Sequence, residues 1–298
     1  MADLAHVTGV DALLANQGTI IASHDFEAAY HILASDPSHA KLAAEVQESI
    51  RSYFGQLELP EHVTLYDELL LSLRPKDVIA TFNWDPLLAQ AYKRHRDLKM
   101  LPRILFLHGN VELGACIPHK QKGFLEHSCP VCGESLSPQP LLYPIEQKNY
   151  DRDPLIANEW TEFRDALEAA YLITVFGYAA PKSDVAAREA MLDVWMRNPS
   201  RELAEFEIID IKPRHEVEAT WKEFFVRSHF GVTDSLRNSL ALISPRRSCD
   251  HFAMASLQQR PCKERRLPQF ESLSDLRMFA QALMIEEENL ASGVPLPC

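Results

Sequence analysis

The sequence predicts an α/β fold, namely an open, Rossmann-like parallel sheet with an inserted zinc ribbon and with helical segments at both ends. Four short apolar runs rich in β-branched residues are typical of strands buried on both faces of a sheet. Helical segments lie between these runs, as connections between parallel strands require. A stretch rich in cysteine and histidine follows the second run, and its spacing indicates a metal site.

Length and composition describe a globular chain. Its 298 residues are 46% hydrophobic, enough for a large α/β domain with a smaller module attached. The net charge of −12 argues against nucleic acid as a partner, because phosphate binding needs a broad basic surface. The sequence has no apolar run of about 18 residues, so we expect no membrane span. Six cysteines and the lack of a secretory signal among the first residues favour a cytoplasmic location.

Residues 1–74 are predicted to form a helical N-terminal segment. Asp36 and Pro37 resemble an N-cap followed by proline in the first turn, and apolar residues then recur at helical spacing over 40–54. A second buried helix is expected over 64–73, where a proline follows closely.

The α/β domain is expected over residues 75–230. Its strands are predicted at 77–82, 103–107, 171–176 and 206–211. Its helices are predicted at 86–96, 153–170, 184–197 and 215–227. Residues 231–298 form a helical C-terminal tail, in which 273–284 is the clearer helix. A basic cluster in this tail, which includes Arg246, is interpreted as a solvated face; an anionic partner is the alternative.

Polar residues follow every predicted strand of the sheet. Because the carboxyl ends of parallel strands meet at one edge, these residues are expected to line one crevice. They are Asn83 and Asp85 after the first strand, His108 and Gly109 after the second, Gly177, Tyr178 and Asp184 after the third, and Asp210 near the end of the fourth.

Residues 112–140 are predicted to be a zinc knuckle. Cys116 and His119 form one pair with two residues between them, and Cys129 and Cys132 form another. Zinc prefers four such ligands in a tetrahedron, and a closed site of this kind is structural. His127 remains an alternative to His119, and a reduced loop without metal remains the plainer interpretation.

The ordered motifs resemble the sirtuin family. The segment TFNWD (81–85) is similar to the sirtuin Thr-Gln-Asn-x-Asp segment, and a His-Gly pair then precedes a zinc ribbon that ends in CPVCGESLSP. FGYAAPKSD (176–184) resembles the Gly-(Thr/Tyr)-Ser segment. These elements keep the family's order over roughly residues 75–215.

The resemblance implies NAD as substrate or ligand, with structural zinc as the cofactor. It places the nicotinamide ribose near His108, Asn83 and Asp85, where the imidazole would accept a hydroxyl proton or activate water. The remaining cofactor contacts that it implies are Gly109, Gly177, Tyr178, Asp184 and Asp210. The residues also permit purely structural roles: His108 as a turn cap, and Asp85 and Asp184 as helix N-caps.

Two departures from the family shape the functional hypothesis. The glycine-rich turn that approaches the cofactor phosphates in sirtuins has no counterpart upstream of residue 75. Tyr143 and Pro144 stand where deacylating sirtuins pair with an acyl-lysine peptide. We therefore expect an NAD glycohydrolase that releases nicotinamide and ADP-ribose, as in bacterial anti-phage effectors. An inactive sensor or scaffold that binds NAD or ADP-ribose is the alternative, a protein-lysine deacylase is the third, and a protein partner or homo-oligomer is compatible with each.

Overall fold

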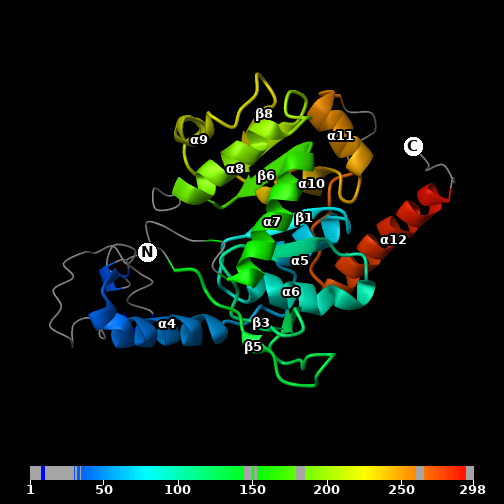
Figure 1. Ribbon diagram of the computed structural model, residues 1–298. Coiled ribbons are helices and arrows are strands. Elements are labelled where there is room, and N and C mark those ends of the chain that lie inside the picture. Colours follow the sequence, from blue (N-terminus) through cyan, green and yellow to red (C-terminus); the bar gives the residue numbers. More distant parts are fainter. Residues whose placement is uncertain are drawn as a thin grey trace.

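The computed structural model describes residues 8–10, 30, 32–33, 35–143, 150, 153–178, 185–259 and 265–292. Within these residues the protein is a mixed α/β structure with parallel strands, as the sequence predicts (Figure 1). The parallel strands fall into two sheets, and a small antiparallel sheet carries the cysteines.

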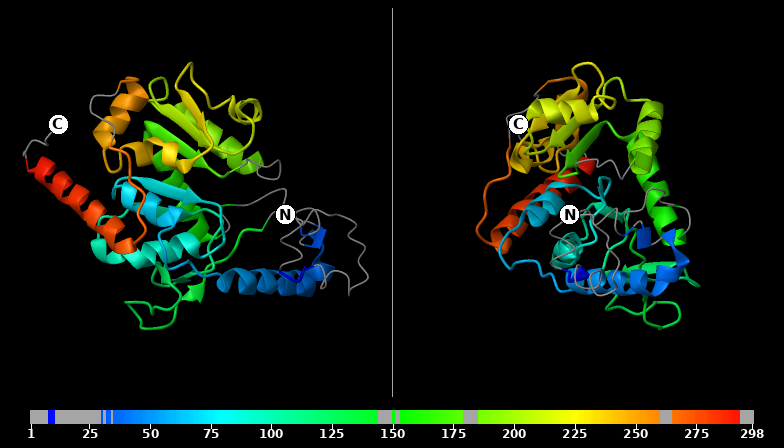
Figure 2. Two further views of the ribbon diagram at one scale, coloured as in Figure 1. Left: turned by 180° about the vertical axis from the view of Figure 1, so that it is seen from behind. Right: turned by 90° about the vertical axis from the view of Figure 1, so that its left-hand side faces the viewer.

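The first parallel sheet pairs β1 (Val78–Thr81) with β2 (Arg103–Phe106), so that Val78 lies opposite Arg103. The second has β7 (Glu205–Ile209) between β6 (Leu172–Phe176) and β8 (Phe230–Thr233). In Figures 1 and 2 the first sheet lies below the second. The strand β8 was not expected from the sequence, and it spans the predicted boundary at residue 230.

Helices cover both faces of these sheets. On one face, α7 (Pro154–Ala169) packs against β1 and β2 and also beside α8 (Val185–Arg197). Its buried Trp160 joins a core with Leu105 and Leu107. On the other face, α5 (Leu65–Ser72) packs against α6 (Leu87–His95). The two halves of the molecule are thus held together by helices on both sides.

The C-terminal elements pack on this framework. They are α9 (Arg214–Trp221), η4 (Leu236–Asn238), α10 (Leu240–Ile243), α11 (Ser248–Ser256) and α12 (Leu273–Ala291). Both α10 and α12 contact α5. Arg246 is 2% exposed and forms a two-pronged ion pair with Glu287 of α12, at 2.6 and 3.1 Å. Arg246 therefore belongs to the interior, which corrects its assignment to a solvated basic face.

The zinc-binding region forms its own antiparallel sheet, in the order β4-β3-β5. Its strands are β3 (Leu113–Cys116), β4 (Gln121–Phe124) and β5 (Ser137–Pro138). Charged side chains tie the sheet to neighbouring helices: Lys122 pairs with Glu159 of α7, and Lys93 of α6 pairs with Glu126 at 2.8 Å. The ribbon is thereby anchored between α6 and α7.

The N-terminal helix α4 (Ala40–Gly55) extends along the lower side of the molecule in Figure 1. The turn η1 (Pro37–His39) precedes it, and the carboxylate of Asp36 accepts a hydrogen bond from the Ser38 amide at 2.8 Å, as an N-cap does. Arg51 donates to the Gln139 carbonyl at 2.8 Å, so α4 also contacts the end of the zinc-binding sheet.

Most predicted elements are confirmed within a few residues, and two are shorter than expected. Residues 206–211 were predicted as strand, but β7 ends at Ile209 and Ile211 is 90% exposed. The Asp210 carboxylate accepts from the Lys212 amide at 3.0 Å, which starts a turn. The helix expected at 215–227 ends at Trp221. A further short helix, η2 (Arg96–Leu98), follows α6.

Candidate functional site

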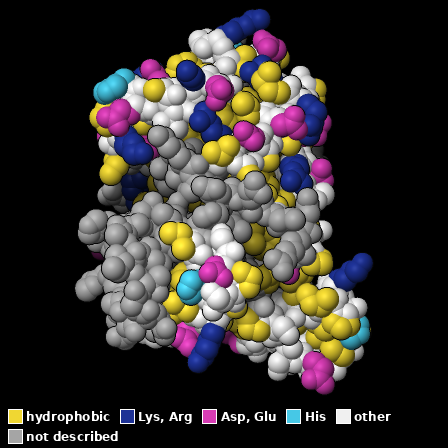
Figure 3. All heavy atoms as spheres, turned by 60° about the vertical axis from the view of Figure 1, so that its left-hand side comes forward, with side chains coloured by type: hydrophobic (Ala, Val, Ile, Leu, Met, Phe, Trp, Pro, Cys, Tyr) yellow, Lys and Arg dark blue, Asp and Glu magenta, His cyan; other side chains and the backbone are white. Residues whose placement is uncertain are grey.

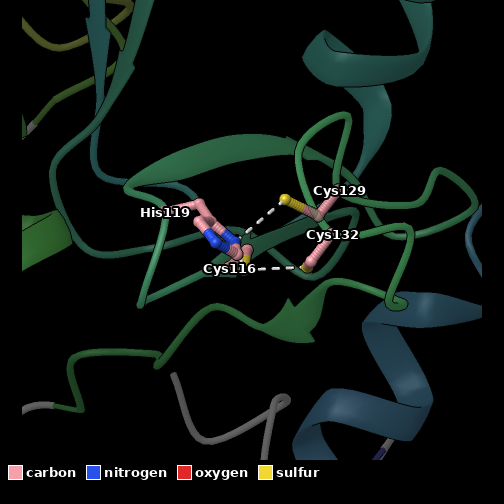
Figure 4. A group of neighbouring side chains, drawn as sticks. All are labelled: Cys116, His119, Cys129 and Cys132. Atoms are coloured by element: carbon pink, nitrogen blue, oxygen red, sulfur yellow. Dashed lines mark hydrogen bonds between the residues drawn. The ribbon is translucent and has the colours of Figure 1, made fainter.

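Four side chains converge at the tip of the antiparallel sheet, and Figure 4 shows them pointing toward one another. Cys116 ends β3, and a tight turn after it brings in His119. Cys129 and Cys132 come from the loop between β4 and β5. One ligand atom from each lies within 4.8 Å of all the others. The sequence-predicted ligand set is therefore brought together in space.

The distances between these atoms fit a tetrahedral zinc ion. The Sγ atoms of Cys116 and Cys132 are 3.8 Å apart, and His119 Nδ1 is 3.3 and 3.7 Å from the sulfurs of Cys116 and Cys129. Zinc–sulfur bonds of about 2.3 Å in a tetrahedron separate two sulfurs by about 3.8 Å. His127 lies outside the group, with its Nε2 3.6 Å from the Glu126 carboxylate, so His119 fills the fourth position.

The local backbone prepares Cys129 to bind metal as a thiolate. Burial by itself raises the pKa of this thiol, but the backbone N–H groups of Cys132 and Val131 favour the anion and lower its pKa to about 6. The Gly133 amide donates to the Cys129 carbonyl at 2.8 Å, and Gly133 has a φ of +77°, which closes the turn. The chemistry of the four donors and their geometry thus match a structural zinc site.

His108 lies at the carboxyl end of β2 inside an aromatic cluster. His108 is 5% exposed, and its ring contacts Phe82 edge to face, with 4.8 Å between the ring centroids. On the other side it faces Tyr150, parallel within 10° at 6.2 Å. Phe82 also stacks on Tyr178 at 4.5 Å, so residues that follow β1, β2 and β6 form one aromatic cluster.

Gly109 has a structural reason to be glycine. Its φ is +81°, and a Cβ at this position would lie 2.1 Å from the Pro140 carbonyl oxygen. The neighbouring His108 carbonyl accepts from the Leu142 amide at 2.9 Å. The chain that returns from the zinc-binding sheet therefore crosses directly over the His-Gly turn.

Asn83 and Asp85 lie on the α5 side of the same strand end. Asn83 is exposed, and its amide side chain hydrogen-bonds Tyr66 of α5. The Asp85 carboxylate accepts from the Leu87 amide at 3.0 Å at the start of α6, which is the capping role that the sequence also allowed. Burial raises the pKa of Asp85 above its usual value. Neither residue has a described contact with His108.

The remaining predicted contacts differ in their surroundings. Gly177 has a φ of +65°, and its amide donates to the Ile209 carbonyl at 3.3 Å; within the described part of the chain, no atom lies within 4 Å of a Cβ placed there. Tyr178 joins the aromatic cluster around His108 through Phe82. Asp210 forms the turn after β7 described above. Asp184, like Pro144, lies outside the described residues.

Two further buried polar residues support the site: Asn110, which belongs to the polar end of the second predicted strand directly after His108 and Gly109, and Glu159, which was not recognised in the sequence. Asn110 is fully buried, donates to the Asp85 carbonyl at 2.6 Å and accepts from the Glu112 amide, so it joins the turns after β1 and β2. Glu159 of α7 is 4% exposed and accepts from the Phe106 amide at 2.7 Å. A glutamate on the apolar face of a predicted helix was the available signal for Glu159.

No protein-family model matches the chain, and no curated protein matches it. Two solved structures are similar in part. A Sir2 homolog–NAD complex has 16% identity and a TM-score of 0.37, over 68% of this chain and 71% of that chain. A Sir2 homologue mutant with ADP-ribose has 17% identity and a TM-score of 0.34, over 63% of this chain and 76% of that chain. Likenesses at this level do not assign the chain to a family.

Basic and acidic side chains are interspersed over the upper part of the face that Figure 3 presents. Among the described helices, none is long and apolar enough to cross a membrane.

Proposed function

We propose that this protein binds NAD at the crevice around His108 and hydrolyses its N-glycosidic bond, releasing nicotinamide and ADP-ribose. The observation that carries the proposal is the position of His108, a 5% exposed imidazole at the carboxyl end of a parallel strand and within an aromatic cluster. Ligands of open α/β sheets bind at this edge. The resemblance of the ordered motifs over residues 75–215 to sirtuins supports NAD as the ligand.

The proposed chemistry uses an ordinary property of imidazole. Cleavage of the bond between the ribose and nicotinamide builds positive charge on the sugar, and water then attacks the same carbon. A neutral imidazole can accept the proton that this water loses. Nicotinamide leaves as a neutral molecule, so the step needs no further reactant. The rings of Phe82 and Tyr178, which stack on each other at 4.5 Å, would form an apolar wall beside the imidazole.

Asn83 and Asp85 would act from the α5 side of the strand end. An amide such as that of Asn83 can hold a carboxamide or a water, and a carboxylate such as that of Asp85 can stabilise the developing cation. Zinc, held by its four ligands, would keep the ribbon folded beside the site and take no part in the reaction.

Release of nicotinamide from NAD tests the proposal directly. The native protein is expected to release it, and His108→Ala is expected to be at least about 100-fold slower, since a positioned general base contributes that much. His127→Ala is the matched control, because this histidine is outside both the aromatic cluster and the zinc ligand set. Equal rates for native protein and His108→Ala would remove the catalytic assignment. If the native protein does release nicotinamide, an anti-phage role is tested by comparing plaque formation on cells that carry the native protein with plaque formation on cells that carry His108→Ala.

One observation favours a second candidate, a sensor or scaffold that binds NAD or ADP-ribose without turnover. The chain has 10 glycines, and no two of them lie within four positions of each other, so no closely spaced glycines are available to cradle a phosphate. Calorimetry with NAD and with ADP-ribose separates the two candidates. Binding without nicotinamide release supports the sensor, and release supports the hydrolase.

A further inference from the structure

The central strand of the second parallel sheet carries two acids on a face that helices cover. Side chains alternate along a strand, so Glu205, Glu207 and Ile209 of β7 share one face of the sheet. Ile209 packs with Leu242, so this is the face that α10 covers. The residues of β7 that alternate with these three pack with α8 and α9 on the opposite face. Both acids therefore point into the layer between the sheet and α10, where apolar side chains are expected.

Glu207 ties three segments of the chain together. It is 6% exposed. One carboxylate oxygen accepts from the Thr174 hydroxyl of β6 at 2.8 Å, and the other accepts from the amide of Leu240, the first residue of α10, at 3.0 Å. The backbone of α10 is thus attached to the sheet through one carboxylate. Because both partners are hydrogen-bond donors, they favour the ionised form of Glu207.

Glu205 lies on the same face, two positions before Glu207. Its side chain is 16% exposed, and its carboxylate is 3.8 Å from Nδ1 of His229. This nitrogen is also 3.1 Å from the Ala255 carbonyl of α11, and it donates its proton there. A Cβ at Gly231 of β8 would lie 3.8 Å from the Glu205 carboxylate. The start of β8 and one face of α11 therefore surround this carboxyl group.

Neither acid has a lysine or an arginine as a partner among the residues that the structure describes. The two arginines on neighbouring segments are engaged elsewhere: Arg227 pairs with Glu202 at 3.3 Å, and Arg237 pairs with Glu68. The four residues of α10, LALI, carry no charge. A second negative charge in this layer would therefore have no cation to balance it.

The surroundings divide the two acids into one that is charged and one that holds a proton. Burial, and then the charge of Glu207, raise the pKa of Glu205 to about 7. Burial also raises the pKa of Glu207, but the bonds from Thr174 and Leu240 act in the opposite direction. Below a pH of about 7 the pair therefore carries one negative charge, on Glu207, and one proton, on Glu205.

The other titratable groups on this side supply no positive charge. Burial raises the pKa of Tyr171, which precedes β6, so its phenol stays neutral. Burial lowers the pKa of His251 in α11, so its imidazole is neutral at a pH of about 7 and above. Asp77 and Asp250 act on His251 by their negative charge, and Cys249 of α11 is exposed. His229 is thus the one titratable side chain described beside the pair.

We propose that Glu205 and Glu207 form a pH-sensitive latch: with one proton on the pair, α10 and α11 are held on the sheet, and loss of that proton to solvent releases them. Once both carboxyl groups are ionised, two like charges share a layer with little water and no cation. They are stabilised only when water enters. Since β7 is bonded to β6 on one edge and to β8 on the other, the helices are the part that can move.

The release would extend beyond the two helices. α10 also contacts α5, and the Leu267 amide donates to the Leu242 carbonyl of α10 at 2.8 Å. The segment that leads to α12 is therefore attached to the same helix. This device goes beyond the function proposed for His108 and does not depend on it.

Amide hydrogen exchange of Leu240 measures the latch directly, because this amide donates to Glu207. Its protection factor compares the measured rate with that of an unstructured chain at the same pH. We expect this factor to fall about tenfold between a pH of about 6 and a pH of about 8. Low urea is expected to leave the exchange of Leu240 at the higher pH unchanged, because a local opening exposes little surface. The Leu107 amide, which bonds to the other sheet, should exchange faster in urea.

Three variants assign the proton. Glu205→Gln keeps the shape of the side chain without a proton to lose, so the protection factor of Leu240 should stay constant over this pH range. His229→Gln removes the other titratable side chain beside the pair and is expected to keep the pH dependence of the native protein. Glu202→Gln, at an exposed position just before β7, is the matched control and should also keep it.

Several results would overturn the proposal. One is a protection factor of Leu240 that does not change with pH, and another is an equal fall in Glu205→Gln and in the native protein. Loss of the pH dependence in His229→Gln but not in Glu205→Gln would assign the proton to the histidine. Acceleration of Leu240 exchange by low urea, in parallel with Leu107, would show that the pair affects only global unfolding. The series in pH and urea on the native protein decides this last point even if a variant does not fold.

Discussion

Gly109 shows how a residue selected from a sequence motif can be fixed by the backbone. The His-Gly pair drew attention because it follows a strand, and the resemblance to sirtuins implied a contact with the cofactor. The structure adds a steric reason, because the Pro140 carbonyl passes over this position and the φ of Gly109 is +81°. Gly177 shares the positive φ, but a Cβ there would meet no atom within 4 Å among the residues that the structure describes. A comparison of the two glycines therefore separates the effect of backbone strain from the effect of steric overlap.

Gly109→Ala is expected to destabilise the protein by about 3 kcal/mol or more, because strain at positive φ adds to an overlap that the backbone must move to relieve. Gly177→Ala should cost only about 1 kcal/mol, the strain alone. Chemical denaturation of both variants measures the difference. Equal denaturation midpoints for the two variants would mean that the segment around Pro140 moves aside without loss of stability.

The titration of Glu205 should make the free energy of unfolding depend on pH. Burial, and then the nearby charge of Glu207, raise its pKa from 4.5 to about 7. His229 is 3.8 Å away, but its Nδ1 faces the Ala255 carbonyl at 3.1 Å and so donates its proton there. Between these two pKa values the folded state binds more protons than the unfolded state, so stability is present at low pH and falls as pH rises through about 7.

Glu205→Gln is expected to remove this loss. The free energy of unfolding of the variant, compared with that of the native protein, should therefore be roughly 2 kcal/mol more favourable at pH about 8 than at pH about 5. Thermal or urea unfolding across this range measures the gain. Glu61→Gln, at an exposed position, is the control and should leave the pH profile unchanged. Parallel profiles for Glu205→Gln and native protein would contradict the assignment.

At the scale of single elements, the sheet β4-β3-β5, which carries the four possible zinc ligands, has little core of its own. Its strands have two to four residues, and its own buried cluster consists of Cys116, Cys129 and Leu136. This cluster buries little apolar surface for three short strands, so we expect a bound zinc ion to supply further stabilisation. Lys122 and Glu159 hold the sheet to α7 but do not replace that contribution.

His119→Ala is expected to lower zinc content well below one ion per chain, whereas His127→Ala should leave it unchanged. Metal analysis of both purified proteins measures this directly. Chelation of the native protein should also increase hydrogen exchange within β3 and β4 while β7 stays protected. Zinc loss in His127→Ala, but not in His119→Ala, would reverse the ligand assignment.

At the scale of the whole molecule, residues far apart in the sequence are joined through Arg246. Its guanidinium binds Glu287 of α12 and donates to the carbonyls of Leu73 and Met100, while its amide donates to the Ser72 carbonyl at 2.7 Å. One side chain thus connects the end of α5, the segment before β2 and the last helix. The C-terminal helices are integrated into the fold in this way.

Glu287→Ala is expected to destabilise the protein by about 3–5 kcal/mol, because it leaves the Arg246 charge buried without its partner. Glu288→Ala, on the exposed side of the same helix, should change stability by no more than about 0.5 kcal/mol. Urea unfolding of the pair measures the contrast. A small effect of Glu287→Ala would show that water reaches Arg246.

Local rules were sufficient for most of the elements, although not for β8, and for the cysteine ligands. The capping box at Thr64 and Asp67 begins α5 at the predicted position, because a cap needs only neighbours in the sequence. The zinc ligands were predictable for the same reason, since each pair is presented by one tight turn. The choice of His119 over His127 was not, because both lie within reach along the chain and only the turn after Cys116 decides between them.

The sequence by itself determined the α/β class, the helices, the parallel strands and the composition of the zinc site, because periodicity, caps and short-range spacing are properties of neighbouring residues. Only the tertiary structure decided that the strands form two sheets, that Asn83 lies on the α5 side while His108 lies among aromatic rings, and that Arg246 is interior. These features depend on contacts between segments far apart in the chain, for which a single sequence carries no local signal.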